Sequence, residues 1–145
     1  MWRYDIGGGM STQQLKAILP TPSVDSIVFW EGCDKEALML QRCGECGKFF
    51  YYARRLCPHC GSQDVSWEGS SGAGTVFSFS EVHVSFFGPQ WEDQLPYTVA
   101  LIDLQEGPRV LTRLLLQPGQ EPRIGDRVDV TFVKVHGRKL PFFKL

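Results

Sequence analysis

The second half of the chain alternates apolar and polar positions with the period of β-strands. In its first segment Val76, Ser78 and Ser80 oppose Phe77 and Phe79, and β-branched and aromatic residues dominate the segments that follow. Turns that contain Gly and Pro separate these segments. The predicted strands are residues 75–84, 97–104, 109–116, 127–135 and 140–145.

Five strands joined by short turns and one longer loop, residues 86–95, predict a small Greek-key barrel of the OB type. The longer loop contains Phe86, Phe87 and Trp91. Aromatic side chains exposed on a loop indicate an interface, although a loop folded back over the barrel mouth is a competing interpretation. We predict that these three residues contact a partner or a ligand.

The first half of the chain changes to a helical period after Pro22, with Ser23 as a predicted N-cap. Phe29 and Trp30 widen the apolar stripe of this short helix beyond what a small domain needs. They either pack on the core of this chain or dock on a partner, and both interpretations remain open. The residues spaced along one side of the predicted helix are Val24, Ile27, Val28 and Glu31.

Four cysteines carry the strongest chemical signal. Two C-x2-C pairs are separated by ten residues, and Gly47 and Gly61 directly follow them. A glycine tolerates positive φ, which lets each tight turn curl and aim its N–H groups at the sulfurs. This spacing predicts one tetrahedral zinc site with four thiolate ligands. The predicted ligands are Cys43, Cys46, Cys57 and Cys60.

Other uses of these cysteines are weaker. Adjacent disulfides would suit a secreted protein, but no signal peptide is visible, and a redox pair would need a βαβ pattern that the sequence lacks. His59 lies inside the second pair, where four thiolates leave no need for it. A site with four thiolates has no open position for water or substrate, so we expect the zinc to be structural and not catalytic.

An aromatic run, residues 49–52, lies between the two cysteine pairs, and Arg54 and Arg55 follow it. In a ribbon with little core, such a run usually covers the metal site. Two alternatives are a stacking platform for nucleic-acid bases and a site where the arginines hold the phosphates of a nucleotide-like cofactor such as coenzyme A. We predict Arg54 and Arg55 as further contact residues.

The predicted domains are a leader at residues 1–22, the helix and zinc ribbon at 23–68, and the OB-fold domain at 69–145. The leader contains three glycines before Met10, which itself resembles a natural start, so residues 1–9 are left out of the fold prediction. Residues 69–74, rich in Gly and Ser, predict a flexible joint or a bulged turn between the two domains.

Charge and hydropathy narrow the classes of partner. The chain has 15 basic and 16 acidic residues and a net charge of -1, so no positive field concentrates nucleic acid. No apolar run approaches the roughly 20 residues that span a bilayer. Reduced thiols suit the cytoplasm, where we expect the protein.

A catalytic constellation is not visible. Cys33 is interpreted as a buried thiol, and His83 and His136 as ordinary strand residues without a nucleophile or carboxylate partner. Glu92 and Asp93 are neighbours in a loop. The side chains of adjacent loop residues seldom converge on one bond of a substrate, so we interpret this pair as a solvated acidic turn. An independent enzyme would need a hidden site built from Cys33, His83 or His136.

The order of these parts resembles a known family, the zinc-ribbon plus OB-fold proteins catalogued as domain of unknown function thirty-five. The match extends from about Ser23 to the C-terminus and rests on several motifs together. They are the Phe29-Trp30 helix, LQRCGECG at 40–47, CPHCG at 57–61, GAGTVFSF at 72–79, PYTVALIDL at 96–104 and IGDRV at 124–128. One departure is the stretch 49–55, where the family often has a proline before its arginine.

The resemblance implies a rubredoxin-like zinc ribbon, an OB-fold barrel and a role as a small partner subunit of thiolase-superfamily proteins. In such complexes the partner carries the catalytic residues and binds most of the acyl-CoA thioester, while the small subunit supports the partner and helps to shape the acyl-CoA pocket. We therefore expect a noncatalytic zinc-binding accessory subunit in a hetero-oligomer for thiolysis, condensation or retro-aldol cleavage. The alternative is an OB-fold protein that binds single-stranded nucleic acid.

Overall fold

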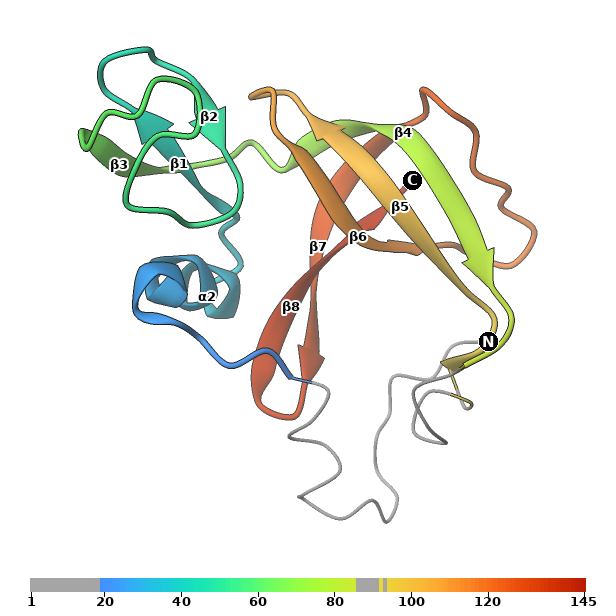
Figure 1. The fold of residues 1–145 in the computed structure, drawn as a ribbon. Coiled ribbons are helices and arrows are strands. Elements are labelled where there is room, and N and C mark those ends of the chain that lie inside the picture. Colours follow the sequence, from blue (N-terminus) through green and yellow to red (C-terminus); the bar gives the residue numbers. More distant parts are fainter. Residues whose placement is uncertain (1–18, 86–91, 93) are drawn as a thin grey trace.

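The computed structural model of the 145-residue chain describes residues 19–85, 92 and 94–145. A short helix, a three-stranded ribbon and a closed five-stranded barrel follow one another along the chain (Figure 1). This confirms the predicted mainly β fold. The elements are η1 (Val24–Ser26), α2 (Ile27–Asp34), β1 (Met39–Cys43), β2 (Phe49–Phe50), β3 (Val65–Gly69), β4 (Ala73–Val82), β5 (Tyr97–Leu104), β6 (Arg109–Leu115), β7 (Arg127–Val135) and β8 (Arg138–Lys144).

The helix begins close to the predicted position because Ser23 and Ser26 form a capping box. The Ser26 hydroxyl accepts a hydrogen bond from the Ser23 N–H at 2.9 Å, and the Ser26 N–H donates to the Ser23 carbonyl at 3.0 Å. The helix ends where Glu36 takes a left-handed φ of 61° and the Ala37 N–H donates back to the Gly32 carbonyl at 2.8 Å. This last bond is the long-range bond of a Schellman C-cap.

One side of α2 packs into the molecule, and it is the side that carries Phe29, Gly32 and Cys33. Gly32 is required there, because a Cβ at this position would lie 2.8 Å from the Ala37 carbonyl oxygen. Phe29 is only 7% exposed, so it is a core residue of this chain. The stripe that the sequence spacing singles out lies on the other side of the helix and is exposed. Its apolar residues are Val24, Ile27 and Val28.

The ribbon sheet has the order β2-β1-β3, with both pairs antiparallel. The alternation of Leu38, Leu40 and Arg42 with Met39 and Gln41 in the sequence predicts a strand, and this strand is β1. Strand β3, which was not predicted, pairs along the whole of β1. Gln41, in the middle of β1, is buried and binds the backbone of residues 51–56, which we call the ribbon loop. Its Nε2 donates to the Arg54 carbonyl at 3.0 Å, and its Oε1 accepts from the Arg54 N–H at 2.7 Å. These two hydrogen bonds fix the backbone of the ribbon loop at Arg54.

The barrel closes in the order β4-β5-β6-β8-β7, which confirms the predicted OB-type topology. Strand β5 alternates cleanly, with every second side chain from Thr98 to Leu104 buried. A bulge between Val76 and Ser78 bends β4 so that it pairs with β5 along its length and with β7 at its start. The single parallel pair, β6 with β8, completes the closure.

The larger apolar core extends from the helix into the barrel, as α2 packs beside β8. Because the helix and β1 contribute to the same core as the barrel, the helix and ribbon pack directly against the barrel. The buried members are Phe29, Cys33, Leu38, Leu40, Val76, Ala100, Ile102, Leu104, Val110, Leu114, Val128 and Phe143.

The connection between β3 and β4 is a short hydrogen-bonded turn. The Ser70 N–H donates to the Leu38 carbonyl at 2.7 Å, and the Ser71 N–H donates to Glu106 Oε1 at 2.6 Å. Gly72 has a φ of 75°, and a Cβ there would lie 2.3 Å from Val130 Cγ1. These hydrogen bonds hold the connection against both the ribbon and the barrel.

Candidate metal centre

The two cysteine pairs form matching turns. The Gly47 N–H donates to the Cys43 carbonyl at 2.9 Å, and the Gly61 N–H donates to the Cys57 carbonyl at the same distance of 2.9 Å. Both glycines have positive φ, 71° and 77°, as their position after each pair predicts. The chain therefore uses one turn twice to present two pairs of sulfurs.

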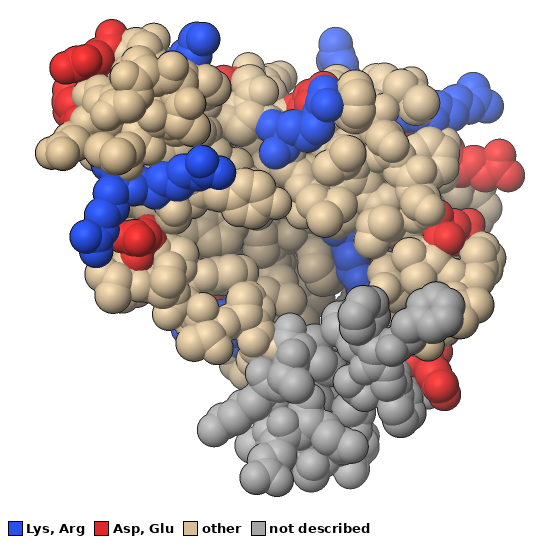
Figure 2. Space-filling view, in the orientation of Figure 1, with Lys and Arg blue, Asp and Glu red and all other residues tan. Residues whose placement is uncertain are grey.

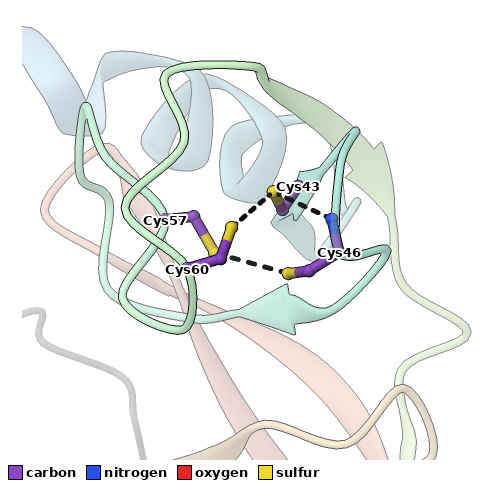
Figure 3. A group of neighbouring side chains, drawn as sticks. All are labelled: Cys43, Cys46, Cys57 and Cys60. Carbon is purple, nitrogen blue, oxygen red and sulfur yellow. Dashed lines mark hydrogen bonds between the residues drawn. The ribbon is translucent and has the colours of Figure 1, made fainter.

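The four sulfurs converge on one point between the turns (Figure 3). All lie within 4.8 Å of one another, and none forms a disulfide. The Cys43 and Cys60 sulfurs are 3.6 Å apart, and those of Cys46 and Cys57 are 3.7 Å apart. Four sulfurs at about 2.3 Å from a tetrahedral zinc ion would be about 3.8 Å apart, so these separations fit such an ion.

Backbone N–H groups also point at the sulfurs. The Cys46 N–H lies 3.5 Å from Cys43 Sγ, and the His59 N–H lies 3.4 Å from Cys57 Sγ. His59 thus contributes its backbone to the second turn, while the metal-ligating atoms that cluster among the described residues are the four cysteine sulfurs.

The surroundings of Cys43 and Cys60 have opposite effects on the pKa values of these two thiols. The Cys46 N–H stabilises the Cys43 thiolate and lowers the pKa of Cys43 to about 7. For Cys60 the Ser62 N–H acts in the same direction, but hydrogen bonds with the neighbouring sulfurs outweigh it and raise the pKa to about 12. A divalent cation removes this conflict because it stabilises every thiolate that binds it. The donor set therefore fits zinc.

A small apolar layer covers the inner side of the cluster. Phe50, from the aromatic run, is buried with Cys43 and Cys57, and Val65 packs against them. The rest of the run points elsewhere: Phe49 and Tyr51 pack against the main core, and Tyr52 is exposed. The interpretation that the run covers the metal site is thus right for Phe50 alone.

The predicted contact residues have different surroundings. Trp30 is partly buried and meets the Phe29 ring edge-on, with centroids 4.9 Å apart. Arg54 is exposed and held through its backbone, and the Arg55 guanidinium lies 3.1 Å from Asp25 Oδ1. Phe86, Phe87 and Trp91 lie outside the described residues.

The groups that an independent enzyme would need are not brought together. Cys33 is fully buried, and burial raises the pKa of its thiol to about 12, which makes it a poor nucleophile. The prediction that His83 has no carboxylate partner is wrong, since its Nε2 lies 3.0 Å from Glu81 Oε1. Both side chains, however, are more than half exposed. His136 lies in the turn between β7 and β8, with a φ of 47°.

A cavity of about 560 Å³ opens at one end of the barrel. Sequence reasoning missed it, because it forms only when the ends of β5 and β6 come together. Arg113 borders the cavity, with its guanidinium 3.8 Å from the Tyr97 ring centroid and its Nη1 donating to Gln94 Oε1 at 2.7 Å. The lining residues are Glu81, Pro96, Tyr97, Thr98, Arg113, Leu114, Leu115, Leu116, Gln117 and Pro118.

Within the described part of the chain, no helix has the length and apolar character needed to cross a bilayer.

Two family descriptions match consecutive parts of the chain. Residues 30–66 match the rubredoxin-like zinc ribbon domain of ChsH2, and residues 67–133 match the C-terminal OB-fold domain of ChsH2. A solved structure described as the Ltp2-ChsH2(DUF35) aldolase superimposes with a TM-score of 0.75 at 31% identity, covering 87% of this chain and 98% of that one.

Relatives with similar sequences have several kinds of name. A DUF35 domain-containing scaffold protein of Methanocaldococcus jannaschii is 31% identical over 103 residues, 70% of this chain and 72% of the relative. The subunit BbsA of benzoylsuccinyl-CoA thiolase from Thauera aromatica is 32% identical over 90 residues, 62% and 59% of the two chains. A probable enoyl-CoA hydratase alpha subunit of Thermomonospora curvata is 34% identical over 105 residues, which is 71% of this chain but only 32% of that subunit.

The four-sulfur cluster and the closed barrel thus lie in the parts of the chain that match the two ChsH2 domains in turn, and the chain belongs to the DUF35 family of paired zinc-ribbon and OB-fold domains.

Proposed function

We propose that the chain is a noncatalytic accessory subunit that binds structural zinc and supports a thiolase-superfamily partner acting on acyl-CoA. The observation that carries the proposal is the closed sulfur cluster: it offers four protein ligands and leaves no place for a substrate. The remaining candidate groups, Cys33, His83 and His136, lie apart and form no catalytic constellation among the described residues.

The names of the relatives support this role. A thiolase, an aldolase and a hydratase perform different chemistry on different bonds, yet proteins with these names contain the modules of this chain. A module found with three reactions is not specific to any one of them. Each of the three names describes a subunit or a component of an assembly, which supports a role for this chain in support and not in chemistry.

The metal ligands in this proposal are Cys43, Cys46, Cys57 and Cys60. When bound, the zinc holds the two turns together and takes no part in the reaction. The protein's own contribution is to place Phe50 and Val65 over the cluster and to fix the ribbon loop through Gln41. Because all four thiols must stay reduced to bind zinc, we expect a cytoplasmic location.

In this proposal the partner binds most of the acyl-CoA thioester. The cavity at the barrel end supports a smaller contribution from this chain, since leucine and proline side chains form half of its lining, beside polar residues that include Glu81 and Arg113. A cavity with such a lining suits an acyl group better than a phosphate. Whether the partner performs thiolysis, condensation or retro-aldol cleavage follows from the partner's residues.

The experiment is to purify the tagged chain from its own cells at moderate salt and to combine native mass spectrometry with metal analysis. We expect a thiolase-superfamily protein to co-elute, with one zinc ion for each small chain. A zinc-loaded chain that elutes alone would contradict the proposal.

The same preparation tests the nucleic-acid alternative. On the barrel surface Arg109 is already engaged, with its Nε 2.6 Å from Asp103 Oδ1 and its guanidinium over the Phe77 ring. A paired arginine is less available to neutralise a phosphate. We therefore expect a protein-like absorbance ratio, whereas bound nucleic acid that leaves at high salt would favour the alternative.

A further inference from the structure

The helix α2 with its preceding turn has two apolar sides, and only one of them is used within the chain. Phe29 and Cys33, four residues apart, face the core. Val24, Ile27 and Val28 follow the same helical spacing on the other side, where their exposed fractions are 79%, 43% and 39%. We call these three residues the outer stripe.

An apolar side of a helix is normally covered by packing. The outer stripe also consists entirely of β-branched residues, which lower helix propensity because they lose side-chain freedom. In a helix of eight residues, which is too short to be stable by itself, that composition gives no local advantage. The composition of the outer stripe is therefore that of a surface that packs against another protein surface.

The ribbon loop lies beside the start of the helix. The ion pair between Arg55 and Asp25, 3.1 Å long, joins this loop to the start of the helix. Tyr52 and Leu56, on the same loop, are both exposed. Gln41 holds the loop's backbone at Arg54, between these two residues. Exposed apolar side chains on two adjoining segments are typical of interface anchors.

Charges frame the apolar surface asymmetrically. Arg54 is exposed on the ribbon side, and Glu31 is exposed at the far end of the stripe. Figure 2 shows Lys and Arg side chains, with an acidic group directly beside them, where the ribbon meets the helix, next to a largely uncharged hollow that separates this side from the barrel. A complementary surface would have an apolar centre, an acidic group opposite Arg54 and a basic group opposite Glu31.

We propose that the outer stripe, with Tyr52 and Leu56, is the surface on which the catalytic partner docks, through an apolar groove that has an acidic rim on the ribbon side. This inference rests on the proposed function, and it places the contact on the outer face of the helix and not on the buried Phe29. The partner would cover the stripe and close the second side of α2.

The test compares Val28→Glu with a matched control, Ile124→Glu, in the full chain. Ile124 is 74% exposed on the turn before β7, far along the chain from the stripe. Both variants should keep one zinc ion and the circular dichroism of the wild type. Binding to the purified thiolase-superfamily partner should weaken about 30-fold or more for Val28→Glu, the loss expected of an interface anchor, and remain unchanged for Ile124→Glu.

A second variant, Arg54→Glu, tests the rim. It should slow association and reverse the effect of salt on the association rate, because it places like charges opposite one another. If Val28→Glu and Arg54→Glu both bind as the wild type does, the docking surface is wrong while the proposed function stands. If the wild-type chain itself does not bind such a partner, the proposed function fails as well.

Two other occupants would overturn the inference. A second copy of this chain would appear as a dimer of the free protein in analytical ultracentrifugation, and Val28→Glu would dissociate it. Residues 1–18 would be the occupant if their removal increased dye binding to the free wild-type chain but not to Val28→Glu. We expect a monomer and no difference on truncation.

Discussion

The ribbon and the barrel reach an ordered structure by different routes. In the ribbon, the buried residues around the metal centre are Cys43, Phe50 and Cys57, which is too little apolar surface to fold a chain segment. In the barrel, strands distant in sequence close on each other and bury a continuous core. Local ligand spacing therefore determines the first structure, whereas long-range packing determines the second.

The largest expected effect is on the ribbon alone. Cys46→Ser removes one of four ligands, and zinc binding contributes about 10–16 kcal/mol in zinc-finger peptides. We expect the variant to lose zinc and the ordered structure of residues 43–66, together with support of the partner's activity, while the barrel stays folded. Metal analysis and amide NMR spectra measure the two regions separately.

A suitable control is Cys33→Ala, which should keep a full complement of zinc because Cys33 belongs to the other core. If Cys46→Ser kept dispersed ribbon resonances and full partner turnover, the metal would not hold the ribbon. If the barrel resonances also collapsed, the shared core would make the two regions one cooperative unit.

An intermediate effect is expected in the barrel. Ile102 is fully buried between β4 and β6, and Ile102→Ala should lower the free energy of unfolding by about 2–5 kcal/mol through lost burial and a cavity. Urea unfolding followed by intrinsic fluorescence measures this loss, and the zinc content in native buffer should stay at one ion. Loss of zinc from the folded variant would show that the ribbon depends on the barrel core.

The smallest effect concerns the connection between the two regions. Hydrogen bonds from the Ser70 and Ser71 segment lower the pKa of Glu106 although burial opposes them, so the folded state binds its proton less tightly than the unfolded chain does. The stabilisation is therefore complete above the ordinary value of 4.5 and is lost as the pH falls through the lower folded-state pKa.

We expect Glu106→Gln to cost no more than about 1 kcal/mol near neutral pH, the usual net contribution of one hydrogen bond. Its unfolding free energy should also vary less with pH than that of the wild type between pH 5 and 3. Equal acid sensitivity of both proteins would assign that sensitivity to other carboxylates.

Sequence reasoning succeeded where the determinant is local. Gly47, Gly61 and the four cysteines follow from spacing. The five barrel strands follow from alternation and turn residues, and their predicted ends differ from the structure by at most two residues. It missed β3, because Val65–Gly69 is a short segment with polar residues that becomes a strand only by pairing with β1.

The helix shows why the remainder was not predictable. Both of its sides are apolar, so periodicity alone could not determine which one faces the core; packing beside β8 determines that Phe29 is inside. In the same way Arg54 reads as a side-chain contact in the sequence, whereas its clearest role in the structure is to offer its backbone to Gln41. These outcomes depend on partners distant in sequence.

Because Cys33 is fully buried, the alkylation rate of Cys33 and that of the metal-site cysteines report two different processes. An alkylating reagent reaches the sulfurs of the metal centre at the rate of zinc release, but it reaches Cys33 only when the core shared by helix and barrel opens. Mass spectrometry that resolves which cysteine is modified over time would therefore record metal exchange and core opening in one sample. Docking of a partner on the helix would slow the alkylation of Cys33 and leave the alkylation rate of the metal-site cysteines unchanged.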